Sequence, residues 1–334
     1  MEAQYYSVLE GGKVHCRLCP HSCKLGDGKA GICRIRRNIG GKLIAEGYET
    51  YSAISFDPIE KKPLYHFYPG TEILSVGGLG CNMRCKWCQN CEISQSGVET
   101  RVNKKQMTAR QLLQLAGSRN KNIGIAYTYN EPTIAFESNI QVARLFRKEG
   151  YKNVLVSNGY LSEIPLNEYL KYIDAVNLDI KAFNPITHLQ FTGARLEPVL
   201  KNAVKIFKAG IHLELTYLVV SSVNDDETEF RDFIKWMVKE LGNETPLHIS
   251  RYFPRHEFNV EATNPATLKS FVKIAQEYLD YIYLGNYISQ EYEHTICAEC
   301  KELIIEREGY HVRVSPLSGD GNCNNCGQKV FVAD

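Results

Sequence analysis

Three cysteines stand on a glycine-rich loop at a spacing that suits metal chemistry. Cys81, Cys85 and Cys88 form a C-x3-C-x2-C pattern after the apolar run 73–76, which we expect to be a short buried strand. Three thiolates on one loop can bind three irons of a cubane [4Fe-4S] cluster and leave the fourth iron without a cysteine ligand. Cys91 could complete a zinc knuckle instead. We interpret it as a bystander, because a fourth thiolate would occupy the open iron.

An aromatic residue, Trp87, stands directly before the last cysteine of this pattern. With it, the loop resembles the signature of the radical SAM superfamily. The resemblance implies that the open iron binds S-adenosylmethionine (SAM). It also implies a one-electron reductant of the ferredoxin or flavodoxin type, and cleavage of SAM to a 5'-deoxyadenosyl radical that abstracts a hydrogen atom.

The remaining cysteines fall into two further groups of four, so that all 12 are clustered. Close spacing in a chain without a recognisable export signal favours metal over disulfide bonds. The N-terminal group suits a tetrahedral zinc site or a second iron-sulfur cluster. The C-terminal group forms two C-x2-C pairs that predict a closed, structural zinc ribbon, with a rubredoxin-like iron as the alternative. The first group is Cys16, Cys19, Cys23 and Cys33, and the second is Cys297, Cys300, Cys323 and Cys326.

Apolar strands and amphipathic helices alternate along the middle of the chain. Thr108 and Gln111 fit a capping box at the start of one helix. Repeated βα units predict an α/β fold with a parallel sheet and right-handed crossovers, which is a partial or complete (β/α) TIM-type barrel. The expected strands cover 73–76, 123–129, 153–156, 175–180, 212–219, 247–252 and 281–284, and the expected helices cover 112–115, 134–148, 166–171, 199–208, 227–241 and 268–278.

These patterns give the expected domain boundaries. Residues 1–45 form an N-terminal four-cysteine module, 46–72 an extended connector, 73–290 the barrel, and 291–334 a zinc-ribbon-like module. The charged run 60–62 in the connector is expected to be a solvated face. In an alternative interpretation of this segment, His66 or Tyr68 lines the mouth of the site.

Polar residues follow several of the expected strands, where the chemistry of such a barrel is found. A zwitterionic amino-acid cosubstrate needs a carboxylate near its ammonium and a cation near its carboxylate, and Glu131, Asp179 and Lys181 can supply these charges. The candidate binding residues at strand ends are Asn130 and Glu131, Ser157 and Asn158, and Asp179 and Lys181.

These strand-end motifs resemble the activating-enzyme branch of the same superfamily, the group around pyruvate formate-lyase activase. The stretch 129–132 stands in place of Gly-Gly-Glu-Pro, and 156–159 in place of Asp-Thr-Asn-Gly, with Val156 where that motif has Asp. Leu178-Asp179-Ile180-Lys181 is similar to Leu-Asp-Leu-Lys, which implies SAM contacts at Asp179 and Lys181. The stretch 253–256 resembles Leu-Pro-Tyr-His and makes His256 a further candidate, with a surface histidine as the alternative.

The order of modules along the whole chain is similar to that of the AmmeMemoRadiSam system radical SAM enzymes. The resemblance rests on the N-terminal cysteines, the stretch 57–64, the Cys81 loop and the two C-terminal cysteine pairs. It implies Memo-type and AMMECR-type partner proteins and supplies no defined substrate.

Composition limits the partners and the location. The 334 residues carry a formal net charge of +1, which gives no sign of a general nucleic-acid binder. No apolar run is long enough to span a bilayer, and the N-terminus lacks the basic and apolar parts of a secretion signal. We expect a cytoplasmic protein that has no membrane or nucleic-acid partner.

The sequence therefore predicts a radical SAM enzyme that acts on an unidentified substrate. An activating enzyme for a glycyl radical enzyme of the pyruvate formate-lyase type is the specific alternative. A non-enzymatic electron carrier or scaffold with several metal sites is the alternative of another class, although a carrier needs neither the barrel nor the residues at 179 and 181.

Overall fold

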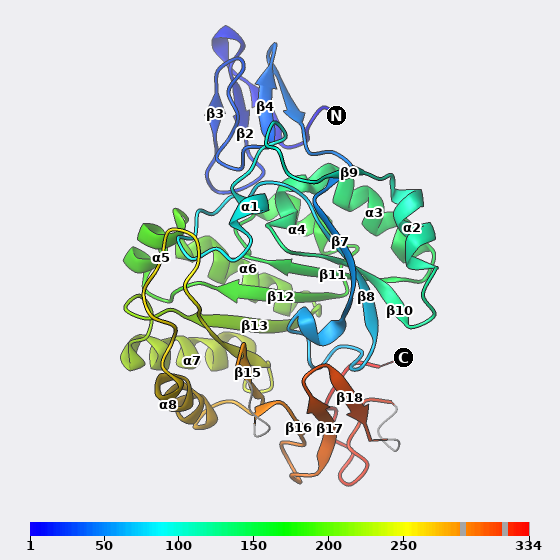
Figure 1. Ribbon diagram of the computed structural model, residues 1–334, viewed down its shortest axis with the longest axis vertical. Helices are drawn as coiled ribbons and strands as arrows, with labels where there is room; N and C mark the ends of the chain where they lie inside the picture. Colours follow the sequence, from blue (N-terminus) through cyan, green and yellow to red (C-terminus); the bar gives the residue numbers. More distant parts are fainter. Residues whose placement is uncertain (288–291, 316–319, 334) are drawn as a thin grey trace.

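A curved sheet of eight strands forms the centre of the computed structural model, which describes residues 1–287, 292–315 and 320–333 (Figure 1). Seven strands are parallel, and β7 (Ala53–Pro58) pairs antiparallel with β8 at one edge. The strand order is β15-β14-β13-β12-β11-β10-β8-β7, so the described strands form a partial barrel that is open between β15 and β7. The α/β fold and the partial barrel that the sequence predicts are confirmed. The parallel strands are β8 (Glu72–Gly77), β10 (Asn122–Tyr127), β11 (Lys152–Ser157), β12 (Ala175–Ile180), β13 (His212–Val219), β14 (Leu247–Arg251) and β15 (Ile282–Gly285).

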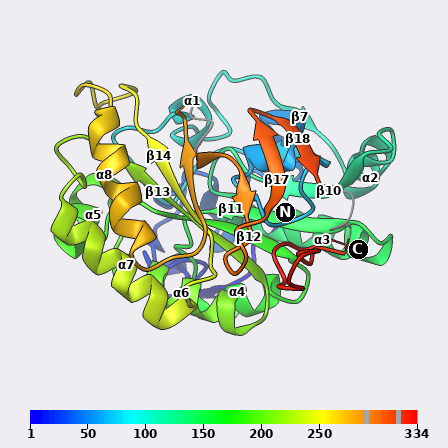
Figure 2. The ribbon, with the colours of Figure 1, turned by 90° about the horizontal axis from the view of Figure 1, so that it is seen from below.

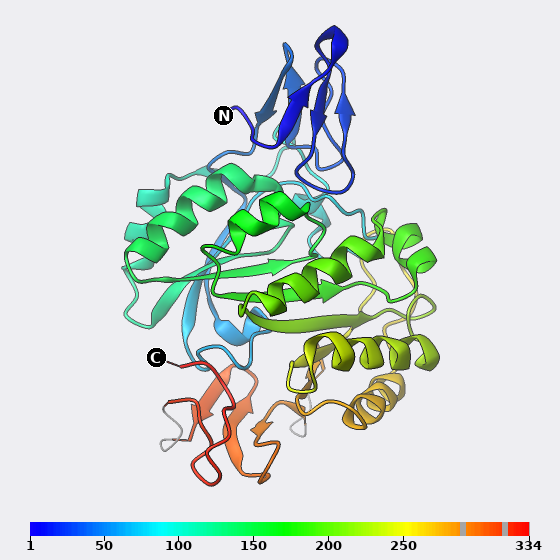
Figure 3. The same ribbon diagram turned by 180° about the vertical axis from the view of Figure 1, so that it is seen from behind.

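Helices cover the outer face of this sheet, as the views from below and from behind show (Figures 2 and 3). The expected capping box is present, because Thr108 and Gln111 each accept a hydrogen bond from the backbone N–H of the other. The described helices are α1 (Cys91–Ser94), α2 (Ala109–Ala116), α3 (Phe136–Lys148), α4 (Glu163–Tyr169), α5 (Pro185–Thr192), α6 (Leu196–Lys208), α7 (Glu227–Leu241) and α8 (Pro265–Gln276). None of them has the length and apolar character needed to cross a membrane.

Several local features differ from the expected pattern of elements, among them the start of α5 and the end of β10. The helix α5 was not expected from the sequence, and it begins where the Asn184 side chain accepts hydrogen bonds from two backbone N–H groups of its first turn. The strand expected to reach residue 129 ends at Tyr127, because Tyr129 adopts a positive φ of 71° and leaves the extended conformation.

Small antiparallel sheets lie at opposite ends of the molecule (Figure 1). The N-terminal part contains two such sheets, and the C-terminal part contains one. A short pair, β6 (Thr50–Tyr51) and β9 (Lys105–Gln106), lies between the first part and the barrel. The N-terminal strands are β1 (Tyr6–Val8), β2 (Val14–Cys16), β3 (Lys24–Leu25), β4 (Arg36–Ile39) and β5 (Lys42–Ala45), and the C-terminal ones are β16 (Thr295–Ile296), β17 (Leu303–Glu308) and β18 (His311–Val314).

The charged run in the expected connector is not a solvated face. Glu60 and Lys62 are buried, and only Lys61 is exposed. A 3-10 turn at Ile59–Lys61 brings the Lys62 ammonium back to Asp57, at 2.7 Å from the carboxylate. The expectation of a solvated face was wrong because Asp57 balances the buried charge of Lys62.

His66 and Tyr68 lie where the C-terminal ribbon packs on the barrel, and neither lines the mouth of the site. The Val330 carbonyl accepts a hydrogen bond from Nδ1 of His66, so the ring nitrogen Nε2 can accept one from the Tyr283 hydroxyl at 2.5 Å. The backbone N–H of His66 donates to the buried carboxylate of Glu214 at 2.7 Å. Both ring nitrogens are therefore used by a neutral imidazole.

This buried imidazole predicts an acid-dependent loss of stability. Burial lowers the pKa of His66 to about 4, whereas a histidine in an unfolded chain titrates near 6.5. Between these values the unfolded state binds more protons, so stability falls as the pH falls, by about 1.4 kcal/mol per pH unit at most. Urea unfolding at pH 7.5 and 5.5 should show a smaller pH effect for His66→Gln than for the wild type.

A matched control is His311→Gln, which changes an exposed histidine of β18 in the same ribbon. It should keep the wild-type pH dependence. If both variants retain the wild-type pH dependence of unfolding, protonation of His66 is not a cause of the loss of stability in acid.

Candidate functional site

A cavity of about 610 Å³ lies at the carboxyl ends of the parallel strands. Its wall contains the three cysteines of the C-x3-C-x2-C loop and six of the seven binding residues expected from the sequence. His256 is the exception, because it does not line this cavity and its Nε2 lies 3.7 Å from the Glu257 carboxylate. The residues brought together are Cys81, Cys85, Cys88, Asn130, Glu131, Ser157, Asn158, Asp179 and Lys181.

The cysteine loop is held tightly on two sides. The Asn130 side chain donates to the Gly80 carbonyl at 2.7 Å and accepts from the Gly78 N–H at 3.1 Å. On the other side the loop packs against the N-terminal module. The two backbones approach so closely there that a Cβ atom added to Gly80 would lie 2.2 Å from the Cys33 carbonyl oxygen. Gly80 also has a positive φ of 78°. Both the conformation and the close approach therefore require glycine at this position.

A pair of glycine substitutions tests this contact. Gly28→Ala has the same kind of backbone strain, at φ 70°, but nothing lies within 4 Å of its added methyl group. We expect this substitution to lower the free energy of urea unfolding by about 1–2 kcal/mol. Gly80→Ala should cost about 1–3 kcal/mol more, because the methyl group overlaps a backbone atom. Equal losses in the two variants would show that the loop does not depend on the contact with Cys33.

Hydrogen-bond donors lie near two of the three loop thiols. The backbone N–H of Met83 lies 3.3 Å from Cys81 Sγ, and the Asn158 amide nitrogen lies 3.7 Å from it. The Ser94 hydroxyl lies 3.1 Å from Cys88 Sγ. Such donors favour sulfur ligands that carry negative charge. The residues present therefore fit a cluster held by three thiolates.

The burial of these thiols also fits a metal-bound state. Burial raises the pKa of Cys85 to about 12, so the free thiol is neutral at ordinary pH. A bound metal reverses this preference, because a coordinating thiol is deprotonated. The indole nitrogen of Trp87 is buried in the same wall without a partner among the described residues.

Both oxygens of the Glu131 carboxylate accept hydrogen bonds from the protein. One oxygen accepts from the backbone N–H and the hydroxyl of Thr133 and from the Ser157 hydroxyl, and the other accepts from the Asn158 N–H at 2.8 Å. Burial nevertheless raises the pKa of Glu131 above its usual value. In this arrangement Glu131 positions the loops after β10 and β11, which form one wall of the cavity.

Asp179 and Lys181 form an ion pair with 2.9 Å between Oδ2 and Nζ. Burial opposes the charge on Lys181, but the Asp179 carboxylate outweighs it and raises the pKa of the ammonium above its usual range. Their side chains are 27% and 16% exposed, so both can reach a molecule in the cavity. A carboxylate and an ammonium presented together can bind the two charged ends of an amino acid.

Sequence reasoning missed two contributors to this site. Lys62 lines the cavity, and its ammonium is held by Asp57, which also accepts from the Tyr129 hydroxyl at 2.6 Å. Asn82 accepts from the Asn158 amide at 2.9 Å and donates to the Tyr160 carbonyl. An acidic residue followed by a proline and two lysines was the available signal for Lys62, but only the 3-10 turn reveals the pairing.

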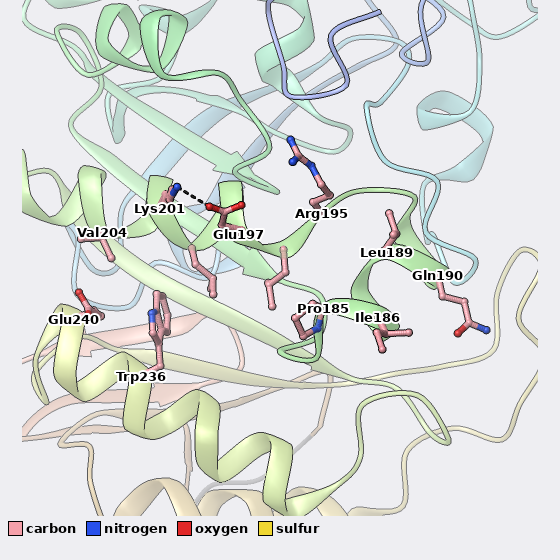
Figure 4. A pocket seen from close by; sticks show the side chains of 12 residues that line it. Pro185, Ile186, Leu189, Gln190, Arg195, Glu197, Lys201, Val204, Trp236 and Glu240 are labelled. Carbon is pink, nitrogen blue, oxygen red and sulfur yellow. Dashed lines mark ion pairs between the residues drawn. The ribbon is translucent and has the colours of Figure 1, made fainter.

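A second and larger cavity of about 880 Å³ lies between α5, α6 and α7 (Figure 4). Its wall is mostly apolar and includes Ile186, Leu189 and Trp236, with an ion pair between Glu197 and Lys201 at the rim. It contains no cysteine. The smaller cavity is therefore the candidate site, since it holds the groups that can bind a metal and a charged cosubstrate.

The four C-terminal thiols form a compact set. All four sulfur atoms lie within 4.8 Å of one another, and the Cys297–Cys326 and Cys300–Cys323 sulfur pairs are 3.5 Å apart. This spacing suits four ligands around one ion. The cysteine cluster that the sequence predicts in this module is thus present and could hold a metal.

One family model and several known proteins are similar to this chain. The Radical SAM superfamily model matches residues 76–234. The chain is 38% identical over 334 residues to "Uncharacterized protein MJ0808" of Methanocaldococcus jannaschii, covering 99% of each protein. It is 27% identical over 119 residues to the (2S)-3-sulfopropanediol dehydratase activating enzyme of Klebsiella oxytoca, covering 36% of this chain and 38% of that protein. A domain of pyruvate-formate lyase-activating enzyme from Bacteroides vulgatus aligns at a TM-score of 0.44 and 16% identity, covering 49% of this chain and 99% of that domain.

Proposed function

Because this chain belongs to the family of the M. jannaschii protein and contains a radical SAM superfamily domain, we propose that it is a radical SAM enzyme acting on an as yet unidentified substrate. The observation that carries the proposal is that one cavity is lined both by three loop cysteines and by the Asp179–Lys181 pair. These three cysteines would hold a [4Fe-4S] cluster, which would supply the electron for reductive cleavage of SAM and so the chemistry of hydrogen abstraction from the substrate.

The chain's own residues bind and orient the reactants in this proposal. Cys81, Cys85 and Cys88 would hold the metal, and the donors near the Cys81 and Cys88 sulfurs would stabilise their negative charge. Asp179 binds the ammonium of SAM, and Lys181 binds its carboxylate. Asn130 and Glu131 keep the loops in place. A ferredoxin- or flavodoxin-type protein is the proposed reductant.

A glycyl radical enzyme is the second candidate for the substrate. The Klebsiella relative is named as the activating enzyme of a dehydratase, and its matching segment supports the same kind of role here. In that case the hydrogen would come from a backbone glycine of a partner protein. Memo-type and AMMECR-type proteins are further proposed partners, and zinc is the proposed metal of the C-terminal ribbon.

SAM binding to the anaerobically reconstituted, reduced protein tests the proposal. We expect SAM to change the electron paramagnetic resonance (EPR) spectrum of the cluster and to yield 5'-deoxyadenosine. Asp179→Asn should weaken SAM binding by about 10- to 100-fold, because a hydrogen bond to a charged group contributes about 1.5–3 kcal/mol.

The control for this substitution is Asp232→Asn, which changes an exposed residue of α7 outside the cavity. It should bind SAM as the wild type does. A reduced cluster whose spectrum is unaffected by SAM, with no 5'-deoxyadenosine formed, would favour the electron-carrier or scaffold alternative.

A further inference from the structure

The four cysteines of the N-terminal module enclose a small space of their own. Cys16 ends β2, and the loops on either side of β3 carry the other three. All four line one small cavity of about 10 Å³, to which Arg36 and Ile134 also contribute. This volume is about the room that one water molecule needs. The cysteines concerned are Cys16, Cys19, Cys23 and Cys33.

A water-sized space lined by all four thiols differs from a compact four-thiolate zinc site. In a four-thiolate zinc site each sulfur lies about 2.3 Å from the ion, so the sulfurs leave no room for a water-sized sphere at the centre. Within the ranges that the structure describes, the C-terminal set is the only one whose potential ligand atoms all lie within 4.8 Å of one another. In a cubane each thiolate binds a different iron, so four thiols around one small space, less closely gathered than the C-terminal set, suit a cubane better than one zinc ion.

An unpaired cationic donor borders the same cavity. Arg36 is 1% exposed, and its two terminal nitrogens are bound to Glu137 at 2.8 and 2.9 Å. Its Nε has no hydrogen-bond partner in the described part of the chain. Buried N–H groups without a partner are rare, because each costs free energy unless a ligand or water accepts from it. A sulfur atom of an anionic cluster is an acceptor of the required kind.

The N-terminal cavity lies against the loop that carries Cys81. The Cys33 carbonyl oxygen lies so close to Gly80 that a Cβ atom added there would overlap it. Gly80 directly precedes Cys81 in the chain. The His21 ring donates to the Asn82 carbonyl at 2.7 Å on the other side of Cys81. Two separate contacts therefore join the N-terminal thiol set to the residues that flank the first loop cysteine.

We propose that the N-terminal four-cysteine module holds a second iron-sulfur cluster, of the [4Fe-4S] type, that exchanges one electron with the cluster on the Cys81 loop. The four thiolates complete this cluster, so it has no open iron for SAM. The step moves one electron and breaks no bond. An external ferredoxin- or flavodoxin-type protein is oxidised by one electron, the N-terminal cluster is reduced and then reoxidised, and the loop cluster is reduced. This exchange rests on the proposed function, whereas the identity of the N-terminal group does not.

Metal analysis of the full chain with the loop site removed tests the first part. In Cys81→Ser/Cys85→Ser/Cys88→Ser, we expect about four irons per chain and an EPR signal after reduction. Metal bound by the C-terminal thiol set, measured in the same sample and in the wild type, serves as an internal standard of folding. Zinc in place of iron at the N-terminal site, in a protein that keeps the wild-type circular dichroism spectrum, would overturn the proposal.

A complementary variant covers the case in which the triple variant does not fold. Cys19→Ser/Cys23→Ser changes only the N-terminal set, so its iron content should fall from about eight to about four per chain. An unchanged iron content would overturn the proposal. Neither metal count involves SAM, so failure here is distinguishable from failure of the proposed function.

The magnetic interaction between the clusters tests the second part. We expect the fully reduced wild type to give a broadened or split EPR spectrum that differs from the sum of the spectra of the two variants. Two iron-sulfur signals that simply add would show that the clusters do not interact across the Cys33–Gly80 contact, and the proposed exchange would be rejected.

Discussion

Replacing Cys85 by alanine should reduce 5'-deoxyadenosine formation from SAM to the background level. Cys85 is one of three loop thiols that line the cavity, and its neighbours in the wall include Asp179 and Lys181. Loss of a partner that only supports a metal ligand commonly costs 10- to 100-fold in affinity or activity, so loss of a ligand itself should cost more than about 100-fold. The assay is mass spectrometry of anaerobic reactions with reductant and SAM.

Cys91→Ala is the matched control for this experiment. Cys91 begins α1 and does not line the cavity, although it follows the loop by only three residues. It should retain 5'-deoxyadenosine formation. Activity that survives Cys85→Ala but not Cys91→Ala would mean that other thiols hold the cluster, and the bystander interpretation of Cys91 would be wrong.

The second large effect concerns the buried ion pair between Arg36 and Glu137. Both side chains are almost fully buried, at 1% and 2% exposure, and the pair joins the N-terminal module to α3. Glu137→Leu would leave the guanidinium charge buried without its partner, which typically costs about 3–5 kcal/mol. The free energy of urea unfolding should fall by that amount.

Two further variants separate the charge from the packing. Glu197→Leu removes an exposed carboxylate of α6 that pairs with Lys201, and should cost less than about 1 kcal/mol. The double variant Arg36→Met/Glu137→Leu removes both charges and should recover much of the lost stability. If Glu137→Leu costs no more than Glu197→Leu, the buried pair does not hold the module to the barrel.

Much of the candidate site could be predicted because it depends on short sequence patterns. The cysteine loop is contained in eight residues, and Asp179 and Lys181 stand at the end of a strand that the sequence shows clearly. Parallel strands place their carboxyl ends at one edge of the sheet, so separate strand-end residues were expected to meet. Six of them do line one cavity.

The parts that could not be predicted depend on contacts between distant segments. Nothing in the sequence shows that Cys33 contacts Gly80. Nor does it show that the Glu131 carboxylate accepts hydrogen bonds from Thr133 and from the distant Asn158. The buried position of Lys62 requires both a local turn and the Tyr129 hydroxyl that shares Asp57 with it. His256 matched a motif by residue type, but its segment does not bring the ring into the cavity wall.

The Arg36–Glu137 pair also determines how the N-terminal module unfolds. The same two side chains bind both backbone groups of Gln4, because Glu137 accepts from its N–H at 2.7 Å and Arg36 donates to its carbonyl at 2.8 Å. Without a bound metal, a segment of this size buries too little apolar surface to be stable alone. We therefore expect the metal-free module to unfold in one cooperative transition with the barrel, and to lose its thiol cavity together with the shape of the Cys81 loop.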